Sequence, residues 1–385
     1  MTFSFRVGAE ELAATPALAP GAGEGRFWVR TETSGYEVTL APQRPGPTEV
    51  VGALLAELGH PLVVADAAVL RHHLPGGLGS VPCLAVEATE ATKSLEGVAS
   101  VLEFLAEQKA GRSSVVVAMG GGVVQDVTGL ACGIFKRGLP WYYVPTTLLA
   151  QADSCIGSKT GVNFRRTKNL LGLFSAPERV VSHPGFLATL PPEDLRSGLG
   201  EIFKLCVTGG ASCLERLEAS LPAALDGDLR VIRELAALAL AVKRPVIEAD
   251  ERDRGVRRAL NFGHSVGHAV EAATGYAVPH GTAVVLGALV ECALSAERGL
   301  LARPVEERLR KVARALVTED QVRRVEAVEP GQLFAALEGD KKVEGVVLKL
   351  AVPVDLGAIE LVDLRLDAAG LVELRGALGC LSSLR

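Results

Sequence analysis

The feature that most constrains the fold is a regular alternation of short apolar segments with amphipathic segments between residues 61 and 147. The apolar segments are short and carry few charges, which is typical of strands buried on both faces of a sheet. The longer segments between them repeat apolar residues at helical spacing. Strands joined through helices form a parallel sheet, so we predict an α/β domain. The predicted strands are "PLVVAD" (61–66), "PCLAVE" (82–87), "SVVVAM" (114–119) and "WYYVPTT" (141–147), and the predicted helices span 93–110 and 123–137.

The pattern changes after residue 190 to long helical segments, with little strand signal before "GVVLKLAVPV" (345–354). A chain of 385 residues is too long for one compact core, and therefore suggests two domains. We predict an α/β domain over residues 1–190 and a mainly α-helical domain over residues 191–385. The first 50 or so residues hold only isolated β-like pieces and predict an early hairpin or an extension.

Composition excludes several classes of protein. The net charge is −5 with a pI near 5.9, and no sustained basic run is present, so we expect no nucleic-acid surface. No run reaches about 18 apolar residues and the N-terminus lacks the pattern of a signal peptide, so we expect a soluble, cytoplasmic protein without membrane contact. The seven cysteines are scattered and never form Cys-x-x-Cys, which predicts reduced core residues.

Three consecutive glycines, Gly120, Gly121 and Gly122, stand between a predicted strand and a predicted helix. Such a turn lets backbone N–H groups at a helix N-terminus approach a phosphate. The spacing is not that of the dinucleotide fingerprint, and a glycine triplet also occurs in ordinary tight turns. The polar segment 146–169 directly downstream favours the binding of a polyhydroxylated, phosphorylated ligand.

Three of the seven histidines lie in "NFGHSVGHAVEAATGYAVPHG" (261–281). His264 and His268 share one face of a predicted helix, and His280 begins the next helix after a break. Each could be an ordinary hydrogen-bonded histidine, but three so close together favour a metal site. Glu201 is the best candidate for a carboxylate ligand, because it lies with Lys204 on an otherwise apolar helix. The alternative is that Glu201 and Lys204 form a surface ion pair.

Several long motifs, in order, resemble the sugar-phosphate cyclases, and most closely the 3-dehydroquinate synthase branch of that family. The resemblance runs from about residue 66 to the C-terminus. Its motifs are "GGGVVQDVTGLACGIFKRG", "VPTTLLAQADSCIGSKTGVN", "KNLLG", "GEIFK", "DERDRGVRRALNFGHSVGHAVEAATGY", "HG" and "DKK". The resemblance implies an N-terminal α/β domain that binds NAD, a helical domain that binds a metal, and an active site between them.

The resemblance also implies roles for individual residues. The implied metal ligands are Glu201, His264 and His280, for zinc or alternatively cobalt. The implied NAD-binding residues are Asp66, Glu90, Lys93, Gly120, Gly121, Gly122, Asp126, Thr146, Thr147 and Lys168. The implied substrate-binding residues are Arg137, Asp153, Lys159, Asn169, Lys204, Lys243, Arg257, Asn261, His268, Lys341 and Lys342, with only one of the two last lysines in contact. The implied catalytic residues are His268, Asp253, Lys204 and Asp153.

The implied reaction converts 3-deoxy-arabino-heptulosonate 7-phosphate to 3-dehydroquinate and phosphate. It proceeds through transient oxidation by NAD, phosphate elimination, reduction and an intramolecular aldol closure, and the enzyme is therefore a carbon–oxygen lyase. The resemblance implies a homodimer in which Arg137 reaches across the interface. An alternative from another class is a metal-dependent polyol dehydrogenase, which shares the two-domain layout.

This sequence departs from the 3-dehydroquinate synthase pattern at several positions. Ser158 stands where a glycine is usual, Asp253 stands where a glutamate is common, and "EATEATK" lacks the glycine that normally precedes Glu90. The first 50 or so residues also match poorly. These departures keep open a relative that cyclises another sugar phosphate, such as sedoheptulose 7-phosphate. Lys243 and Arg257 favour a substrate that carries a carboxylate.

Overall fold

A computed structural model describes residues 3–16, 24–32, 35–165, 167–339 and 343–384. The chain forms two compact units. The first unit contains Met1–Pro16, Pro192–Leu225 and Leu238–Arg385, and the second contains Ala17–Pro191 and Asp226–Ala237. We call them the helical unit and the sheet unit after their main elements.

The sheet unit is built on seven strands in the order β3-β4-β11-β8-β7-β5-β6. All neighbouring strands are parallel except β3, which pairs antiparallel with β4 at one edge. The strands are β3 (Gly25–Arg30), β4 (Gly35–Leu40), β5 (Pro61–Asp66), β6 (Cys83–Val86), β7 (Val115–Gly120), β8 (Trp141–Pro145) and β11 (Arg179–Ser182). The predicted parallel α/β architecture is confirmed. The first 50 residues hold two antiparallel pairs, Phe3–Val7 with Glu10–Ala14 and β3 with β4.

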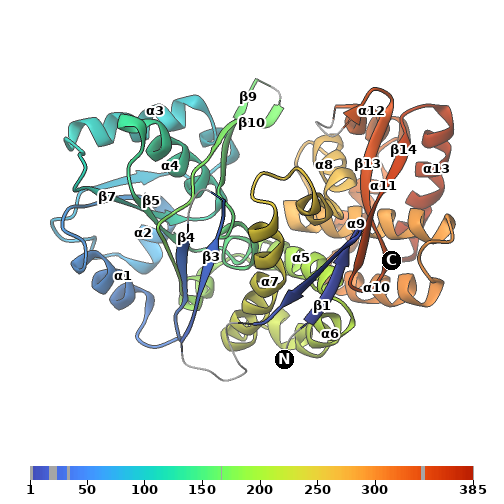
Figure 1. Ribbon diagram of the computed structural model, residues 1–385, viewed down its shortest axis with the longest axis horizontal. Coiled ribbons are helices and arrows are strands. Elements are labelled where there is room, and N and C mark those ends of the chain that lie inside the picture. Colours follow the sequence, from blue (N-terminus) through green and yellow to red (C-terminus); the bar gives the residue numbers. More distant parts are fainter. Residues whose placement is uncertain (1–2, 17–23, 33–34, 166, 340–342, 385) are drawn as a thin grey trace. The chain divides into compact units, whose positions relative to one another are not determined.

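Helices cover this sheet because its central strands are apolar on both faces. Leu62, Val63, Val116 and Val117 are completely buried, as continuous apolar strands require. The helices are α1 (Pro47–Ala56), α2 (Ala67–His73), α3 (Leu95–Glu107) and α4 (Gly122–Ile134), shown from blue to green in Figure 1. They follow β4, β5, β6 and β7 in the chain and so alternate with strands as the sequence predicts.

The register of the central strands brings three loops to one edge of the sheet. Ala65 of β5 pairs with Met119 of β7, and Gly120 pairs with Pro145 of β8. Asp66, Gly121 and Thr146 therefore all lie where parallel strands end. Ligands of open α/β sheets bind at this carboxyl edge.

A separate two-stranded hairpin, β9 (Lys159–Phe164) and β10 (Thr167–Phe174), belongs to the sheet unit. Its β9 strand packs near α4, since a Cβ added at Gly129 would lie 2.5 Å from Thr160. Leu170, Leu173 and Phe174 on β10 are 55%, 39% and 46% exposed.

The helical unit is dominated by long helices, as predicted for the C-terminal half. They are α5 (Pro192–Gly209), α6 (Ala211–Leu225), α7 (Leu229–Ala249), α8 (His264–Ala273), α9 (His280–Glu297), α10 (Arg303–Leu316), α11 (Glu319–Glu326), α12 (Pro330–Glu338) and α13 (Ala368–Leu378). The residues of α7 divide between the two units. Helix α9 is the centre of this unit, because its residues from Gly281 to Ala296 are all buried.

A second sheet lies in the helical unit, with strand order β12-β13-β14-β1-β2. Its strands are β1 (Phe3–Val7), β2 (Glu10–Ala14), β12 (Val343–Glu344), β13 (Val347–Asp355) and β14 (Ala358–Arg365). Strand β1 pairs parallel with β14, Arg6 opposite Ala358. The two ends of the chain thus form one sheet (dark blue and red in Figure 1), a pairing that local sequence patterns do not reveal.

The structure corrects one prediction about the cysteines. Five of the seven are buried, but Cys83 is exposed and Cys380 is half-buried, and all seven are free thiols. Cys83 begins β6, which lies at the edge of the sheet formed by the described residues, and its side chain is exposed there.

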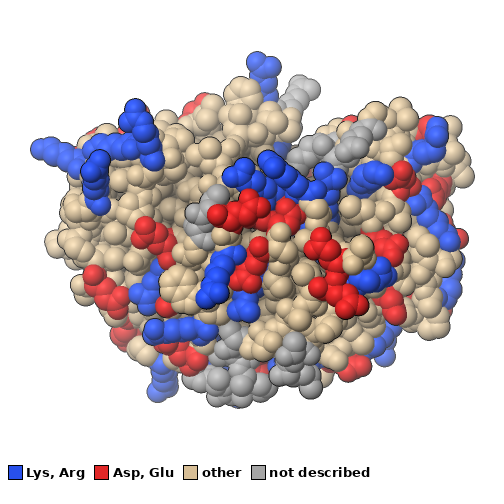
Figure 2. Space-filling model, in the orientation of Figure 1, with Lys and Arg blue, Asp and Glu red and all other residues tan. Residues whose placement is uncertain are grey.

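Charged side chains of both signs are interspersed on the face shown in Figure 2. Among the helices that the structure describes, none combines the length and the apolarity needed to cross a bilayer.

Candidate active site

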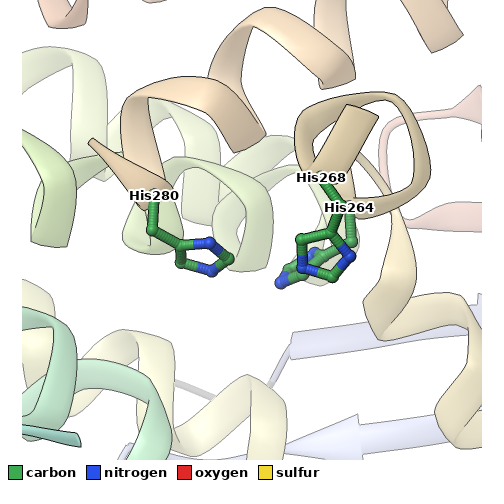
Figure 3. A group of neighbouring side chains, drawn as sticks. All are labelled: His264, His268 and His280. Carbon is green, nitrogen blue, oxygen red and sulfur yellow. The ribbon is translucent and has the colours of Figure 1, made fainter. Parts of the chain in front are cut away.

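Three histidines converge in the helical unit, at the N-terminal ends of α8 and α9. His264 and His268 are four residues apart on α8 and therefore share one face of the helix. Gly275 and Tyr276 both have positive φ values, 62° and 63°, and this left-handed turn sends the chain back toward α8. His280 is consequently the first residue of α9 and faces the α8 histidines (Figure 3).

The three rings are close enough to share one ligand. The ring centroids of His264 and His268 are 5.4 Å apart, those of His264 and His280 5.4 Å, and those of His268 and His280 5.6 Å. One nitrogen of each ring lies within 4.8 Å of one nitrogen of each other ring. His268 is exposed, whereas His264 and His280 are half-buried.

Glu201 on α5 completes this histidine cluster. Its Oε1 lies 3.5 Å from His264 Nε2 and 3.2 Å from His280 Nε2, and its Oε2 lies 2.6 Å from Lys204 Nζ. The Glu201 and Lys204 side chains are 1% and 2% exposed. A surface ion pair is therefore excluded, and the expectation of an inward-facing pair is confirmed.

The donor set fits a divalent metal ion. Neither carboxylate oxygen of Glu201 makes a well-aligned hydrogen bond within the described part of the chain, although both are buried. Lys204 pairs with Oε2, so a bound cation would meet Oε1, which faces His264 and His280. Two imidazole nitrogens and one carboxylate are a common zinc ligand set in catalytic sites.

Electrostatics in the histidine cluster favour an ionised Glu201. Burial is the largest influence on the pKa of Glu201 and would raise it, but Lys204, His264 and His280 together hold it well below its usual value. Burial, reinforced by Lys204, lowers the pKa of His264 well below its usual range. Burial would also lower the pKa of His280, but Glu201 and Glu271 raise it to about 10.

Other predicted site residues of the helical unit lie on α7 and in the segment between α7 and α8. Lys243 on α7 and Arg257 are buried, and Asn261 is half-buried beside the histidine segment. Asp253 is half-buried and has a φ of 59°, a left-handed conformation that aspartate adopts at some cost. Lys341 and Lys342 lie outside the described residues.

Hydrogen bonds to the backbone organise this loop. Asp250 accepts from the backbone N–H groups of Arg254, Gly255 and Arg257 at 2.9, 2.7 and 3.1 Å. The Arg257 guanidinium donates to the Glu251 carbonyl oxygen. Burial would raise the pKa of Asp250, but the three backbone donors hold it below its usual value.

In the sheet unit, the glycine turn leaves the N-terminus of α4 open. Gly121 is the N-cap of α4 and offers no side chain to the first N–H groups. A Cβ added at Gly122 would meet no atom within 4 Å, whereas one at Gly120 would lie 2.6 Å from Val124 and one at Gly121 2.9 Å from Thr147. The first two glycines are thus needed for packing, and the third faces open space where a phosphate can approach.

The other predicted cofactor residues form two groups. Lys93 Nζ lies 2.5 Å from Asp126 Oδ2, and Asp126 also accepts from the backbone N–H of Gly161. Burial raises the pKa of Asp126 despite this ion pair. In the second group, Asn163 donates to Glu90 at 2.6 Å and Lys168 lies 4.0 Å from the same oxygen. Asp66 caps α2 at the carboxyl edge of the sheet, beside the glycine turn.

The remaining predicted substrate residues belong to the sheet unit and not to the unit that carries the histidine cluster. Lys159 begins β9 and is exposed, and Asp153 is half-buried in the turn before it. Arg137 and Asn169 are exposed and have positive φ values of 71° and 51°.

Sequence reasoning missed two buried glutamates beside the histidine cluster. Glu271 lies seven residues after His264, on the same face of α8, and accepts from His280 at 3.0 Å. Glu291 is completely buried in the apolar helix α9 and accepts from the backbone N–H of Gly263. The helical spacing of Glu271 and the isolation of Glu291 in an apolar run were signals for both.

Solved structures of a cyclase and a dehydrogenase share this fold. A 2-deoxy-scyllo-inosose synthase complexed with carbaglucose-6-phosphate, NAD⁺ and Co²⁺ superposes with a TM-score of 0.76 at 20% identity, covering 90% of this chain and 98% of its own. A probable glycerol dehydrogenase from Sinorhizobium meliloti 1021 superposes with a TM-score of 0.62 at 14% identity, covering 88% of this chain and 95% of its own. These two likenesses concern the fold alone.

The chain belongs to the 3-dehydroquinate synthase family. The family models described as 3-dehydroquinate synthase N-terminal and C-terminal match residues 83–197 and 198–343. A 3-dehydroquinate synthase of Cereibacter sphaeroides (strain KD131) is 38% identical over 323 residues, which are 80% of this chain and 86% of the relative. The resemblance to the sugar-phosphate cyclases is confirmed, and the match favours a cyclase over the polyol dehydrogenase alternative.

A second solved structure is similar in sequence as well as in fold. It is a 2-epi-5-epi-valiolone synthase from Streptomyces hygroscopicus subsp. jinggangensis 5008 with NAD⁺ and Zn²⁺ bound. Its TM-score is 0.79 at 30% identity, and the match covers 92% of this chain and 98% of that protein.

Proposed function

We propose that this protein is a sugar-phosphate cyclase that converts 3-deoxy-arabino-heptulosonate 7-phosphate to 3-dehydroquinate and phosphate, and thus a carbon–oxygen lyase. The observation that carries the proposal is the histidine cluster with Glu201 and Lys204, in a chain of the 3-dehydroquinate synthase family. The reaction requires NAD⁺ and a divalent metal, zinc or alternatively cobalt. When bound, NAD⁺ supplies reversible hydride transfer and the metal supplies a Lewis acid.

The proposed metal ligands are Glu201, His264 and His280. Glu201 Oε1 lies 3.5 Å from His264 Nε2 and 3.2 Å from His280 Nε2, and both of those rings are more buried than His268. The more exposed His268 is left to face the substrate phosphate and to transfer protons.

The proposed NAD⁺ site is the carboxyl edge of the main sheet. The open N-terminus of α4 at Gly122 suits the pyrophosphate. The valiolone synthase relative, which has NAD⁺ and Zn²⁺ bound, supports both cofactors. The site residues are Asp66, Glu90, Lys93, Gly120, Gly121, Gly122, Asp126, Thr146, Thr147 and Lys168.

The proposed substrate-binding residues include several cations. Lys204, Lys243 and Arg257 are buried in the helical unit, where charge-assisted hydrogen bonds to a bound anion are strong. We assign Lys243 and Arg257 to the carboxylate side of the substrate, with Asn261 beside them. Lys204, Asp153 and Asp253 join His268 as proton-transfer groups, and Arg137, Lys159, Asn169 and one of Lys341 and Lys342 complete the site.

A second candidate is a cyclase that acts on another sugar phosphate, such as sedoheptulose 7-phosphate. The 30% identity to a valiolone synthase over 92% of this chain favours this alternative, as do Ser158 and Asp253. Arg257 favours the keto acid, because it stands where the resemblance places recognition of the substrate carboxylate, and a guanidinium binds a carboxylate through charge-assisted hydrogen bonds.

The proposed assembly is a cytoplasmic homodimer. Leu170, Leu173 and Phe174 expose apolar surface on the β10 strand, which suits contact with a second copy of this chain. Arg137, which follows α4 and is exposed, would reach the active site of the other subunit. Seven free cysteines fit the reducing cytoplasm.

A phosphate-release assay with three substrates tests this function. The purified protein, NAD⁺ and Zn²⁺ are offered 3-deoxy-arabino-heptulosonate 7-phosphate, sedoheptulose 7-phosphate and glucose 6-phosphate in parallel. We expect release from the keto acid phosphate, and a loss of about 100-fold or more in kcat/KM in Arg257→Ala. Release only from a neutral sugar, with Arg257→Ala as active as the wild type, would establish the alternative substrate class.

A further inference from the structure

His280 contacts a buried glutamate of the neighbouring helix, and a second buried glutamate accepts from the backbone N–H of the residue before His264. His280 begins α9, and its Nδ1 lies 3.0 Å from Oε2 of Glu271 on α8. The Glu271 side chain is 6% exposed. The other ring nitrogen of His280, Nε2, lies on the Glu201 side, 3.2 Å from Oε1. Nδ1 of this ring thus faces the Glu271 carboxylate, and Nε2 faces the Glu201 carboxylate.

The second contact is made by a glutamate of α9 with the start of α8. Glu291 on α9 is 0% exposed, and its Oε2 accepts from the backbone N–H of Gly263 at 2.5 Å. Its Oε1 lies 3.5 Å from the N–H of Val266. Gly263 is the N-cap of α8, has no side chain to cap the helix, and directly precedes His264. Glu291 therefore provides the capping acceptor that this helix start otherwise lacks.

Glycines allow the two helices to approach closely enough for these contacts. A Cβ added at Gly287 would lie 2.2 Å from the Gly263 carbonyl oxygen and 2.5 Å from the Gly267 nitrogen. Gly263 itself has a φ of 78° and would place a Cβ 2.5 Å from the Val284 carbonyl oxygen. The backbones of α8 and α9 are in direct contact at the histidines, so a carboxylate on one helix can reach the start of the other.

We propose that Glu271 and Glu291 are positioning residues for the two histidine ligands. Glu271 on α8 orients His280 of α9, and Glu291 on α9 orients His264 of α8. Glu271 accepts the Nδ1 proton of His280 and so keeps the lone pair of Nε2 directed at the metal. Glu291 fixes the first turn of α8 and hence the direction of His264. The inference rests on the proposed metal ligands, and it explains why two carboxylates are buried among apolar helices at this place.

The test measures the affinity of the protein for Zn²⁺ and not its turnover. Metal-free wild type, Glu271→Gln and Glu291→Gln are titrated with Zn²⁺ in competition with a chromophoric chelator. A glutamine at 271 can present its amide N–H₂ to Nδ1, which would favour the wrong tautomer of His280. We expect each variant to bind Zn²⁺ about 10- to 100-fold more weakly, the range for lost partners of metal ligands.

Glu306→Gln is the matched control. Glu306 on α10 is also a buried glutamate, 3% exposed, but it is paired with Arg303 and Arg310 at 2.9 and 2.5 Å. This variant is expected to lose stability and to keep the wild-type affinity for Zn²⁺. The Co²⁺-substituted proteins provide a second readout, because a rotated ligand changes the visible absorption of Co²⁺ and a distant loss of stability does not.

The outcomes separate this inference from the function on which it rests. If Glu271→Gln and Glu291→Gln bind Zn²⁺ as tightly as Glu306→Gln, the positioning role is refuted. If His264→Ala and His280→Ala also keep the metal, the ligand assignment itself has failed. If Glu291→Gln yields no folded protein, the same titration is carried out with Glu291→Asp, which keeps an acceptor but shortens its reach. Its affinity for Zn²⁺ then decides whether Glu291 is a positioning residue.

Discussion

Gly200 of α5 lies directly against Gly281 of α9, so that a Cβ added at Gly200 would stand 2.3 Å from the Gly281 carbonyl oxygen. The next residue after Gly200 is Glu201, and the residue before Gly281 is His280. A Cβ added at Gly281 would in turn lie 1.8 Å from the Ser197 carbonyl oxygen. The distance between a carboxylate and an imidazole of the histidine cluster is therefore set by the contact of two glycine backbones.

The first prediction concerns this glycine contact. Gly200→Ala is expected to destabilise the protein by about 1–3 kcal/mol, because an added methyl group must push α5 away from α9. The same displacement separates Glu201 from His280, so the variant should also lose metal. Chemical unfolding and metal analysis measure the two effects.

Gly52→Ala is the control for that experiment. Gly52 lies within α1, and a Cβ there would meet no atom within 4 Å. Alanine in an open helical position stabilises by about 0.4–1 kcal/mol. If Gly200→Ala is as stable and as metal-rich as Gly52→Ala, the tight contact does not set the geometry of the histidine cluster.

The second prediction separates the ligands from the substrate-facing histidine. Glu201→Ala, His264→Ala and His280→Ala are each expected to lose most of their bound zinc after dialysis, since each leaves only two protein ligands. His268→Ala should keep its zinc and lose turnover. Elemental analysis of the four variants decides the assignment.

Two results would change that assignment. Zinc content equal to the wild type in all of the first three variants would show that they are not ligands. A loss of zinc in His268→Ala as large as in His264→Ala would place His268 among the ligands, which its nearness to the other two rings permits.

The third prediction concerns the glycine turn of the sheet unit. Gly122→Ala should weaken NAD⁺ binding by about tenfold or more with little loss of stability, because its Cβ would fill open space at the N-terminus of α4. Gly120→Ala should instead destabilise the fold, since its Cβ would lie 2.6 Å from Val124. Calorimetric titration with NAD⁺ and thermal unfolding distinguish the two variants. Unchanged NAD⁺ affinity in Gly122→Ala would show that the pyrophosphate does not bind at this helix N-terminus.

The fourth prediction is a pH dependence of metal binding. In the metal-free protein, Glu201 and Glu271 raise the pKa of His280 to about 10 against the effect of burial. The charged imidazole contributes its full share to the free energy of unfolding below about pH 6.5, the pKa of histidine in the unfolded chain. This contribution is lost as the pH rises through about 10, the pKa of His280 in the folded protein. Zinc must displace this proton, so its affinity should rise by about tenfold per pH unit between these values.

Calorimetry at pH 8 in two buffers of different ionisation enthalpy counts the released protons. About one proton per zinc is expected, because the pKa of His264 is already low and that ring binds without losing a proton. Binding heats that are the same in both buffers would contradict the charged state of His280.

Local patterns were sufficient to predict much of this structure. Continuous apolar strands such as β5 and β7 predict the parallel sheet, and the spacing of His264 and His268 predicts their common face. The pairing of β1 with β14 was not predictable, because strands some 350 residues apart along the chain share no local signal. Whether Cys83 is covered likewise depends on its place on an edge strand, which the order of strands decides.

The histidine cluster shows the same limit at the level of single residues. The sequence indicates the three histidines and Glu201 by their types and spacing, and the family resemblance assigns His264, His280 and Glu201 to the metal. It does not indicate that Gly200 and Gly281 touch, since they are 81 positions apart and only the packing of α5 on α9 joins them. The isolation of Glu291 in an apolar helix marks it as unusual, but the sequence does not indicate that its partner is the N–H of Gly263.

The most direct test of a cyclase in this chain is to measure phosphate and NADH together while the protein turns over 3-deoxy-arabino-heptulosonate 7-phosphate with NAD⁺ and Zn²⁺. A cyclase returns the hydride that it removes, so phosphate should accumulate over many turnovers while NADH absorbance shows no net rise. NADH formed in proportion to the substrate consumed, with no phosphate released, would contradict the cyclase function and establish a dehydrogenase.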